Sequence, residues 1–352
     1  MTFVNVGVIG TGSIASAHLT AYRNHPGVKL LAVCDVNERR AREQAELYGA
    51  AKAYTNYREM LADPDIDAIS ICTWNNSHAE ISIAALDAGK HVLCEKPLSR
   101  TVEEALRVEE AVRRSGNIFQ VGFVRRYGMN AQVLKQFIDA GELGDIYYAK
   151  ASCLRRIGNP GGWFADKERS GGGPLIDLGV HMIDLCWYMM GKPKVTAVFG
   201  NTYDALGNRS NIENLSYYKA SDYDADKNTV EDCANAILRF ENGASLMVDV
   251  SFSLHAKEDE FYVKLYGTKG GAELEPALTL TLEKHNTILN VDPQIDRRSF
   301  TGEDFANQID HFIGCCRDGR TPNSSVEDGL ELMKMLCAIY EAAESKKEVV
   351  FI

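Results

Sequence analysis

A lysine that follows an apolar run is the first candidate for chemistry in this chain. Residues 93–98 read LCEKPL, so the apolar run ends in Glu95, Lys96 and Pro97. Pro97 lacks a backbone N–H and favours an extended conformation at Lys96, which predicts a strand end rather than a helix. Ligands of open α/β sheets bind at the carboxyl ends of strands, and Lys96 is therefore expected in a functional site.

A glycine motif near the N-terminus predicts a dinucleotide site. An expected buried strand over 4–9 runs directly into GTGSIA at 10–15, which opens an expected helix over 14–22. In this G-x-G-x-x-A pattern Gly10 permits a tight turn, Gly12 leaves room for a pyrophosphate, and Ala15 lets helix and strand pack closely. The N-terminus of the helix supplies N–H donors to the phosphates.

An acidic residue at the end of the next apolar run indicates which cofactor binds. Asp35 follows the run 30–34 and lies 23 residues after Gly12. A carboxylate there accepts hydrogen bonds from the adenosine ribose and repels a 2′-phosphate, which favours NAD over NADP. Arg39 and Arg40 keep NADP open as an alternative, because either could pair with a phosphate. Both arginines also fit a solvated helix face.

The elements that must position these residues alternate regularly. Expected helices over 38–48, 57–61, 80–88 and 102–115 separate expected strands over 68–72, 91–95 and 118–121. Such alternation predicts a parallel sheet covered by helices. The polar loop 73–78 follows a strand at the carboxyl edge of this sheet, so we expect it to contact the cofactor.

The overall composition limits the classes of function. With 352 residues the chain is long enough for two domains, and the 45% hydrophobic and 25% charged content is that of a globular protein. A net charge of −11 argues against binding to nucleic acid or to an anionic membrane surface. The nine cysteines contain no C-x-x-C pair, so reduced thiols in a cytoplasm fit best. We find neither a leader segment nor a membrane span in the sequence.

Beyond residue 122 the regular alternation stops, and we place the domain boundary there. Domain 1–122 is expected to bind the dinucleotide, and domain 123–352 to bind substrate and mediate oligomerisation. A loop at 158–164, rich in turn residues, carries Trp163 as a candidate substrate wall. The alternative is that Trp163 fills the junction between domains. The polar segment 201–231 has no role that the sequence decides.

One expected helix over 174–190 carries an aspartate and a histidine. Asp177 and His181 are four residues apart and therefore on one face, with Asp184 close to the same side. In isolation a histidine on an apolar helix is more often a satisfied core residue. An Asp-His-Asp metal site is conceivable, but a supporting pattern such as H-E-x-x-H is missing, and we expect no metal.

These motifs resemble the Gfo/Idh/MocA oxidoreductases, the family of glucose-fructose oxidoreductase and inositol dehydrogenase. The stretches QVGFVRRY at 120–127 and GGGPLIDLGVH at 171–181 add to the resemblance, which covers essentially the whole chain. It implies an α/β N-terminal Rossmann domain and an α+β C-terminal domain with a large open, mostly antiparallel mixed sheet. That sheet is often an oligomer interface, so we expect a homo-oligomer, a dimer or tetramer, in the cytoplasm.

The resemblance and the motifs together assign a set of site residues. The expected catalytic residues are Lys96, Asp177 and His181. The expected cofactor contacts are Gly10, Gly12, Ser13, Ile14, Asp35, Arg40, Thr73, Trp74, Asn76, His78, Glu95 and Lys96, and the expected substrate contacts are Arg125, Tyr127, Trp163, Asp177 and His181. We further expect a cis Lys96–Pro97 bond, and Lys96 and His181 approaching one small volume beside the nicotinamide.

The predicted activity is NAD(H)-dependent hydride transfer at a secondary alcohol of a sugar, a cyclitol or a glycoside. His181 would act as general base, Lys96 would stabilise alkoxide character, and Asp177 would orient substrate or His181. Three alternatives stay open: oxidation of a glycoside to a 3-keto sugar, reduction of a keto-sugar, and a catalytically silent dinucleotide sensor. The sensor is disfavoured because the lysine and the histidine are both present.

Overall fold

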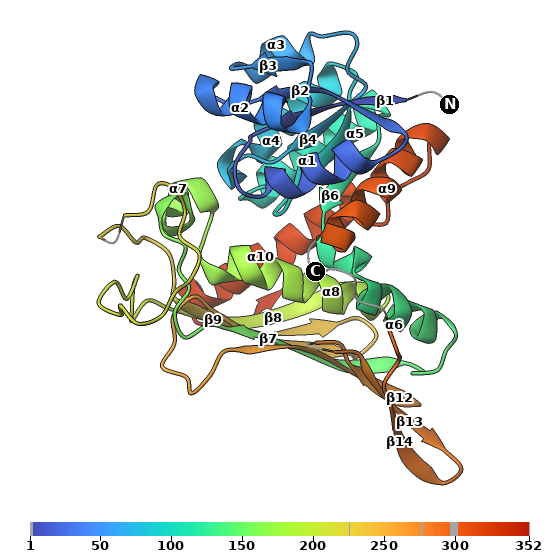
Figure 1. Ribbon diagram of the computed structural model, residues 1–352. Helices are drawn as coiled ribbons and strands as arrows, with labels where there is room; N and C mark the ends of the chain where they lie inside the picture. Colours follow the sequence, from blue (N-terminus) through green and yellow to red (C-terminus); the bar gives the residue numbers. More distant parts are fainter. Residues whose placement is uncertain (1–2, 225, 276, 296–301, 352) are drawn as a thin grey trace. The chain divides into compact units, whose positions relative to one another are not determined.

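The computed structural model describes residues 3–224, 226–275, 277–295 and 302–351. These residues form two compact units, Met1–Tyr127 with Arg297–Met333 and Gly128–Asp296 with Lys334–Ile352. Each unit is built around its own sheet (Figure 1). None of the described helices combines the length and the apolar content that a transmembrane span needs.

The first unit contains a six-stranded sheet in the order β3-β2-β1-β4-β5-β6, and all its pairings are parallel. Its strands are β1 (Val4–Ile9), β2 (Val28–Cys34), β3 (Lys52–Tyr54), β4 (Ala68–Ile71), β5 (His91–Glu95) and β6 (Phe119–Gly122). The order reverses between β1 and β4, which is the point where doubly wound sheets bind dinucleotides. The predicted Rossmann fold is thereby confirmed.

Helices connect these strands and cover the sheet (Figure 1). They are α1 (Ala15–Asn24), α2 (Glu38–Tyr48), α3 (Tyr57–Leu61), α4 (Asn75–Asp87) and α5 (Val102–Ser115), followed by the 3-10 turn η1 (Val124–Tyr127). Local sequence sets their limits. In α5, for example, the Thr101 side chain accepts a hydrogen bond from Glu104 N–H, and Gly116 ends the helix with a φ of 67°.

A helix from the C-terminal part of the chain completes the first unit. Helix α9 (Gly302–Asp318) places Ile309, Phe312 and Ile313 in the same buried core as β1 and α1. The sequence predicts a second, substrate-binding and oligomerisation domain over residues 123–352. That functional division stays a prediction, but α9 packs with the dinucleotide-binding fold.

The second unit contains a nine-stranded sheet in the order β14-β13-β12-β11-β7-β10-β9-β8-β15. Its strands are β7 (Ile146–Leu154), β8 (Val195–Tyr203), β9 (Cys233–Phe240), β10 (Ser245–Ser251), β11 (Glu260–Gly267), β12 (Gly270–Glu273), β13 (Thr279–Lys284), β14 (Thr287–Val291) and β15 (Val349–Val350). The β7–β10 pair is parallel and the other pairings are antiparallel, so the predicted mixed, mostly antiparallel sheet is confirmed.

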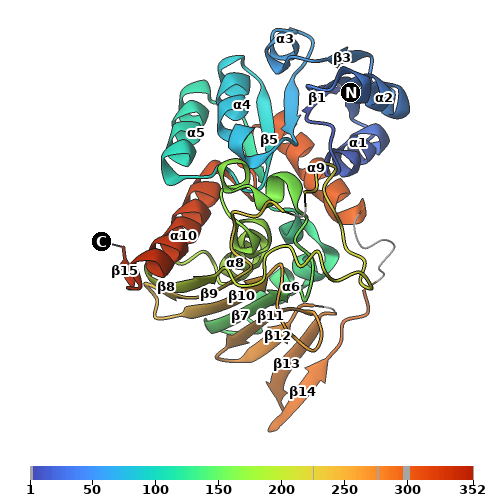
Figure 2. The ribbon, with the colours of Figure 1, turned by 90° about the vertical axis from the view of Figure 1, so that its left-hand side faces the viewer.

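Helices lie on one face of this sheet (Figure 2). They are α6 (Met129–Asp139), α8 (Val180–Met189) and the C-terminal part of α10 (Val326–Ser345). Shorter elements precede α8: the 3-10 turn η2 (Gly162–Ala165), α7 (Lys167–Ser170) and the π-helical turn η3 (Leu175–Gly179). Figures 1 and 2 show no described helix of the second unit on the opposite face.

Candidate active site

The glycine loop after β1 has the geometry of a phosphate cradle. Gly10 has a φ of 84°, and a Cβ added to it would lie 2.7 Å from the Cys72 carbonyl oxygen, so its backbone and its packing both require glycine. Gly12 is different, because an added Cβ would meet no atom within 4 Å. Neither the described protein packing nor a left-handed φ explains Gly12. The close approach of a ligand to its backbone does, so these residues fit a dinucleotide.

Asp35 closes the same loop from the end of β2. Its Oδ2 accepts hydrogen bonds from Thr11 N–H at 3.0 Å and from Thr11 Oγ1 at 2.8 Å, while its Oδ1 accepts from Asn37 N–H at 2.8 Å. A carboxylate has about four lone-pair sites, so capacity for a ribose hydroxyl remains. Arg40 Nη1 lies 3.7 Å from Oδ2 and partly offsets the negative charge. Gly10, Gly12 and Asp35 would hold NAD here, together with Ser13 and Ile14.

The polar segment 73–78, predicted as a loop, enters helix α4 at Asn75, and its buried His78 contacts the Lys96 turn. His78 Nδ1 lies 2.7 Å from Pro97 O, and His78 Nε2 lies 3.1 Å from Thr73 O. Burial lowers the pKa of His78, and these two carbonyl contacts act in the opposite direction. Trp74 and Asn76 of the same segment are exposed. The Lys96–Pro97 bond is cis, as predicted.

Glu95 lies beside Lys96 in a buried network that the sequence analysis missed. His18 Nε2 donates to Glu95 Oε1 at 2.8 Å, and His18 Nδ1 lies 2.9 Å from Ser70 Oγ. The other Glu95 oxygen, Oε2, accepts from the backbone N–H of Lys96 at 3.2 Å. Burial alone would raise the pKa of Glu95, but the hydrogen bond and charge of His18 hold it below its ordinary value. The predicted cofactor contact of Glu95 stays a prediction, since its side chain is 5% exposed.

In the second unit the predicted helix over 174–190 begins with a π-helical turn rather than as one regular α-helix. The Val180 N–H donates to the Leu175 carbonyl, five residues earlier, and α8 continues from Val180. Turns of this type are frequent at functional sites. The α-helical spacing that the sequence analysis assumed between Asp177 and His181 is therefore wrong over the first turn.

Asp177 and His181 are nevertheless the two accessible positions of this segment. From 172 to 187 all the other side chains are buried, including Asp184, which is 1% exposed. Two polar side chains that are accessible within an otherwise buried stretch can meet a ligand. Asp184, predicted close to the same side of the helix as Asp177 and His181, does not share their access to the surface.

The remaining predicted substrate residues differ in their surroundings. Tyr127 is buried, its hydroxyl lies 3.2 Å from Ser324 Oγ and its ring lies 5.4 Å from that of His311, so the structure gives its substrate role no support. Arg125 is half-buried in η1. Trp163 is half-buried, and its ring centre lies 3.9 Å from that of Phe164.

The segment 201–231, whose role the sequence left open, packs against the Trp163 loop. Phe164 meets the ring of Tyr218 edge-on at 6.4 Å, and Tyr218 is 54% exposed. The Ala220 N–H donates to Pro160 O at 2.8 Å. These partly exposed aromatic rings fit the predicted substrate wall, which stays a prediction.

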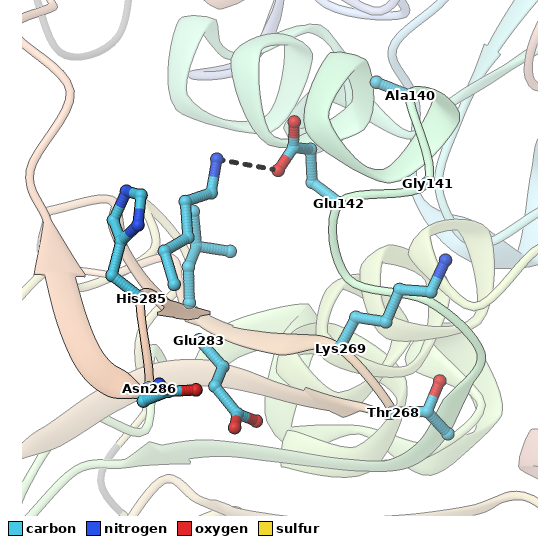
Figure 3. A pocket seen from close by; sticks show the side chains of 10 residues that line it. Ala140, Gly141, Glu142, Thr268, Lys269, Glu283, His285 and Asn286 are labelled. Carbon is cyan, nitrogen blue, oxygen red and sulfur yellow. Dashed lines mark ion pairs between the residues drawn. The ribbon is translucent and has the colours of Figure 1, made fainter.

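A polar hollow of about 520 Å³ in the second unit lies elsewhere (Figure 3). It is lined by Ala140, Gly141, Glu142, Thr268, Lys269 and 282–286, and an ion pair of 3.7 Å joins Lys284 to Glu142. None of the predicted site residues lines it. We therefore assign the candidate active site from the motifs and from the accessible Asp177 and His181. The size of this hollow is not evidence for a site.

The fold and the glycine loop define a dinucleotide-binding protein. Two family models match the chain: "Oxidoreductase family, NAD-binding Rossmann fold" over residues 4–123 and "GFO/IDH/MocA C-terminal domain" over residues 131–273. The chain therefore belongs to the GFO/IDH/MocA oxidoreductase family, as its sequence motifs suggested, and is an NAD-dependent enzyme.

Relatives and solved structures agree with this membership over the full length. D-glucoside 3-dehydrogenase of Escherichia coli (strain K12) is 31% identical over 98% of this chain and 97% of its own. Myo-inositol 2-dehydrogenase of Thermotoga maritima is 29% identical over 98% of both chains. The structure of a levoglucosan dehydrogenase in complex with NADH and levoglucosan is 25% identical, with a TM-score of 0.87 over 99% of each chain.

Proposed function

We propose that this enzyme transfers hydride between NAD and a ring secondary alcohol of a sugar, a cyclitol or a glycoside. The observation that carries the proposal is the polar pair Asp177 and His181, the two accessible side chains between residues 172 and 187, in a chain of this family. The names of the relatives support the substrate class, since they include a glucoside dehydrogenase and an inositol dehydrogenase. Bound NAD would supply the hydride acceptor.

The proposed roles follow from the chemistry of the side chains. His181 takes the hydroxyl proton, because the ordinary pKa of a histidine, about 6.5, suits proton exchange near neutral pH. Lys96 donates a hydrogen bond to the same oxygen and stabilises its developing negative charge. Asp177 orients the substrate hydroxyls or the His181 ring. Arg125 and Trp163 contact the sugar.

A second candidate activity is oxidation at C3 of a glycoside, which gives a 3-keto sugar. The full-length similarity to a D-glucoside 3-dehydrogenase favours it. Reduction of a keto-sugar is the same reaction in reverse. A panel of inositols, free sugars and methyl glycosides, assayed for NADH formation and in parallel with NADP, separates these substrates, and analysis of the product identifies the oxidised carbon.

The first prediction concerns the proposed base and the proposed lysine. His181→Ala and Lys96→Ala should each lower kcat by about 10² to 10⁴-fold, because each removes a group that acts in the transition state. Steady-state turnover of the best substrate tests this, with NADH affinity measured by fluorescence as a check on the cofactor site.

The exposed His255 provides a matched control, and His255→Ala should keep wild-type turnover. Unchanged kcat in His181→Ala or in Lys96→Ala would remove the role assigned to that residue. If NADP is reduced and NAD is not, the assignment of Asp35 as a ribose acceptor fails.

We also infer a cytoplasmic homo-oligomer that assembles through the nine-stranded sheet. The location is supported by the nine cysteines, all of which are free thiols. Assembly is supported by the sheet face without described helices, which carries Phe199 and Ile237 at 45% and 41% exposure.

A further inference from the structure

The helical segment that carries Asp177 and His181 begins without a local cap. Pro174 precedes η3 and lacks a backbone N–H, and no side chain within this segment caps its N-terminus. The first N–H groups of a helix have no partner inside the helix and need an acceptor elsewhere. In this structure the acceptor comes from a residue more than 50 positions away in the sequence.

That acceptor is Glu231, just before β9. Its Oε2 accepts a hydrogen bond from Gly173 N–H at 2.9 Å, and its Oε1 accepts from Leu175 N–H at 3.2 Å. The hydroxyl of Tyr340 on α10 donates to Oε1 at 2.8 Å. One carboxylate thus joins the start of η3, the start of β9 and helix α10. A carboxylate at a helix N-terminus also interacts favourably with the helix dipole.

The glycines before η3 make room for this arrangement. A Cβ on Gly173 would lie 2.5 Å from the Glu231 carbonyl oxygen, and a Cβ on Gly172 would lie 2.0 Å from the Tyr340 hydroxyl. A side chain at either position would push Glu231 or Tyr340 away from η3. Gly171 serves another purpose, because it ends α7 with a φ of 86°. The motif GGG at 171–173 therefore has a physical reason in this chain.

We propose that Glu231 and Tyr340 are positioning residues, which fix the start of η3 and thereby the places of Asp177 and His181. Asp177 lies two residues after Leu175, and its own N–H donates to Gly173 O at 3.0 Å, so it is tied directly to the capped backbone. The expected effect of Glu231 and Tyr340 on turnover rests on the proposed function. Their expected effect on the backbone of η3 does not depend on that function.

Burial raises the pKa of the Glu231 carboxyl group, although the hydrogen bonds from Gly173, Tyr340, Leu175 and its own backbone N–H act in the opposite direction. Burial disfavours the charged form of Glu231, and an acid is nevertheless present at this position. This fits a carboxylate that is needed as a hydrogen-bond acceptor.

The test uses Glu231→Gln in the full-length enzyme. The amide has one oxygen and one NH₂ group, so it cannot accept from both Gly173 and Leu175 in the present geometry, and its NH₂ group must oppose one N–H donor. Amide hydrogen exchange measured by mass spectrometry should become about tenfold faster in peptides covering 172–181. This measurement needs no substrate.

The second measurement is turnover. Misplacement of reacting groups by about 1 Å can cost on the order of 100-fold in rate, and we expect kcat of Glu231→Gln to fall by about 10- to 100-fold. The KM for NAD and the affinity for NADH should stay as in the wild type. If Glu231 had a purely structural role, Glu231→Gln would lower the thermal stability but would not lower kcat selectively while cofactor binding stays unchanged.

Asp232 provides the matched control. It is the adjacent buried acid, but it accepts from Ala205 N–H at 2.6 Å and from Leu206 N–H, so it holds a different segment. Asp232→Asn should leave kcat and the exchange of 172–181 unchanged. Tyr340→Phe removes one donor and keeps the Glu231 cap, so it should lower kcat by only a few fold. It also serves as the test if Glu231→Gln does not fold.

The outcomes separate the two proposals. Unchanged exchange over 172–181 in a folded Glu231→Gln variant overturns the positioning role, whatever the substrate. Faster exchange with wild-type kcat also overturns it, because Asp177 and His181 would then not depend on the cap. If the wild type oxidises no member of the substrate panel, the proposed function fails, and hydrogen exchange still decides whether Glu231 fixes η3.

Discussion

Glu95 is a buried acid, and each of its two carboxylate oxygens accepts a hydrogen bond. His18 donates a hydrogen bond to one oxygen, and the backbone N–H of Lys96 donates to the other. A buried carboxylate is stable only when it is paired and hydrogen-bonded, so the place of Lys96 depends on a histidine 77 residues before Glu95. Residue spacing gives no sign of such a partner.

The second prediction follows from this pair. His18→Leu keeps most of the side-chain volume but leaves Glu95 buried without its donor, which should lower the free energy of unfolding at pH 7 by about 3–5 kcal/mol. Urea unfolding followed by circular dichroism measures the change. His255→Leu is the matched control, because His255 is exposed, and it should change stability by about 0.5 kcal/mol at most.

The same pair gives a pH dependence with a definite sign. In the wild type the pKa of Glu95 is lowered by folding, so its stabilising contribution is present above the unfolded pKa of about 4.3 and is lost as the pH falls further. Without His18, burial should raise that pKa. The destabilisation of His18→Leu should therefore be largest near pH 7 and shrink toward pH 4. A difference that is constant with pH would contradict the assignment.

Helix α9 shows that an element can belong to a core far from it in the sequence. It buries Phe312 completely against the core that contains β1 and α1, and Arg317 Nη2 donates to Gly27 O at 2.8 Å. The sequence of α9 has an amphipathic pattern. Such a pattern says that one face is buried but does not say against which element.

The third prediction tests how much the dinucleotide-binding unit depends on α9. Phe312→Ala should lower the free energy of unfolding by about 3–5 kcal/mol, because it leaves a cavity in the core around β1. Urea unfolding, with and without saturating NADH, measures the loss. Leu47→Ala, at a side chain that is 60% exposed on α2, should change stability by about 0.5 kcal/mol at most. Equal effects of the two variants would show that α9 is dispensable to this core.

At the scale of the whole molecule, the sequence was most informative where apolar runs alternate with turn residues. The strands and helices of the Rossmann fold follow from such runs. The hairpin of β13 and β14 was missed, because every residue of β14 is exposed and gives no alternation, and its turn uses His285 and Asn286 with positive φ rather than glycine. The π-helical turn η3 was missed since a segment buried on nearly all sides has no periodicity to read.

The open face of the nine-stranded sheet leads to the last prediction. Side chains directed away from the helices form an apolar row across neighbouring strands, in which Phe199 pairs with Ile237 and Ile237 with Met247. Beside the row Tyr148 stacks on Tyr266 at 5.3 Å. A face that water covers in an antiparallel sheet is normally polar, so the proposed homo-oligomer should use this row.

Ile237→Glu should disrupt an oligomer formed through this face, because it places a charge where a specific interface excludes water. Light scattering coupled to size exclusion should then give a mass near the 38.9 kDa of one chain, against a multiple of it for the wild type.

Ile288→Glu is the matched control, since Ile288 is 74% exposed on β14 and lies outside the row, and it should leave the mass unchanged. A monomeric wild type, or an Ile237→Glu variant of wild-type mass, would rule out this face as the interface. Ile288 on the far strand β14 is then the more telling comparison, because it too is an exposed apolar side chain, yet its cross-strand neighbour on β13 is Glu283, so no apolar row continues from it. Continuity of the apolar row, rather than exposure of single residues, is what should make Ile237 sensitive and Ile288 tolerant.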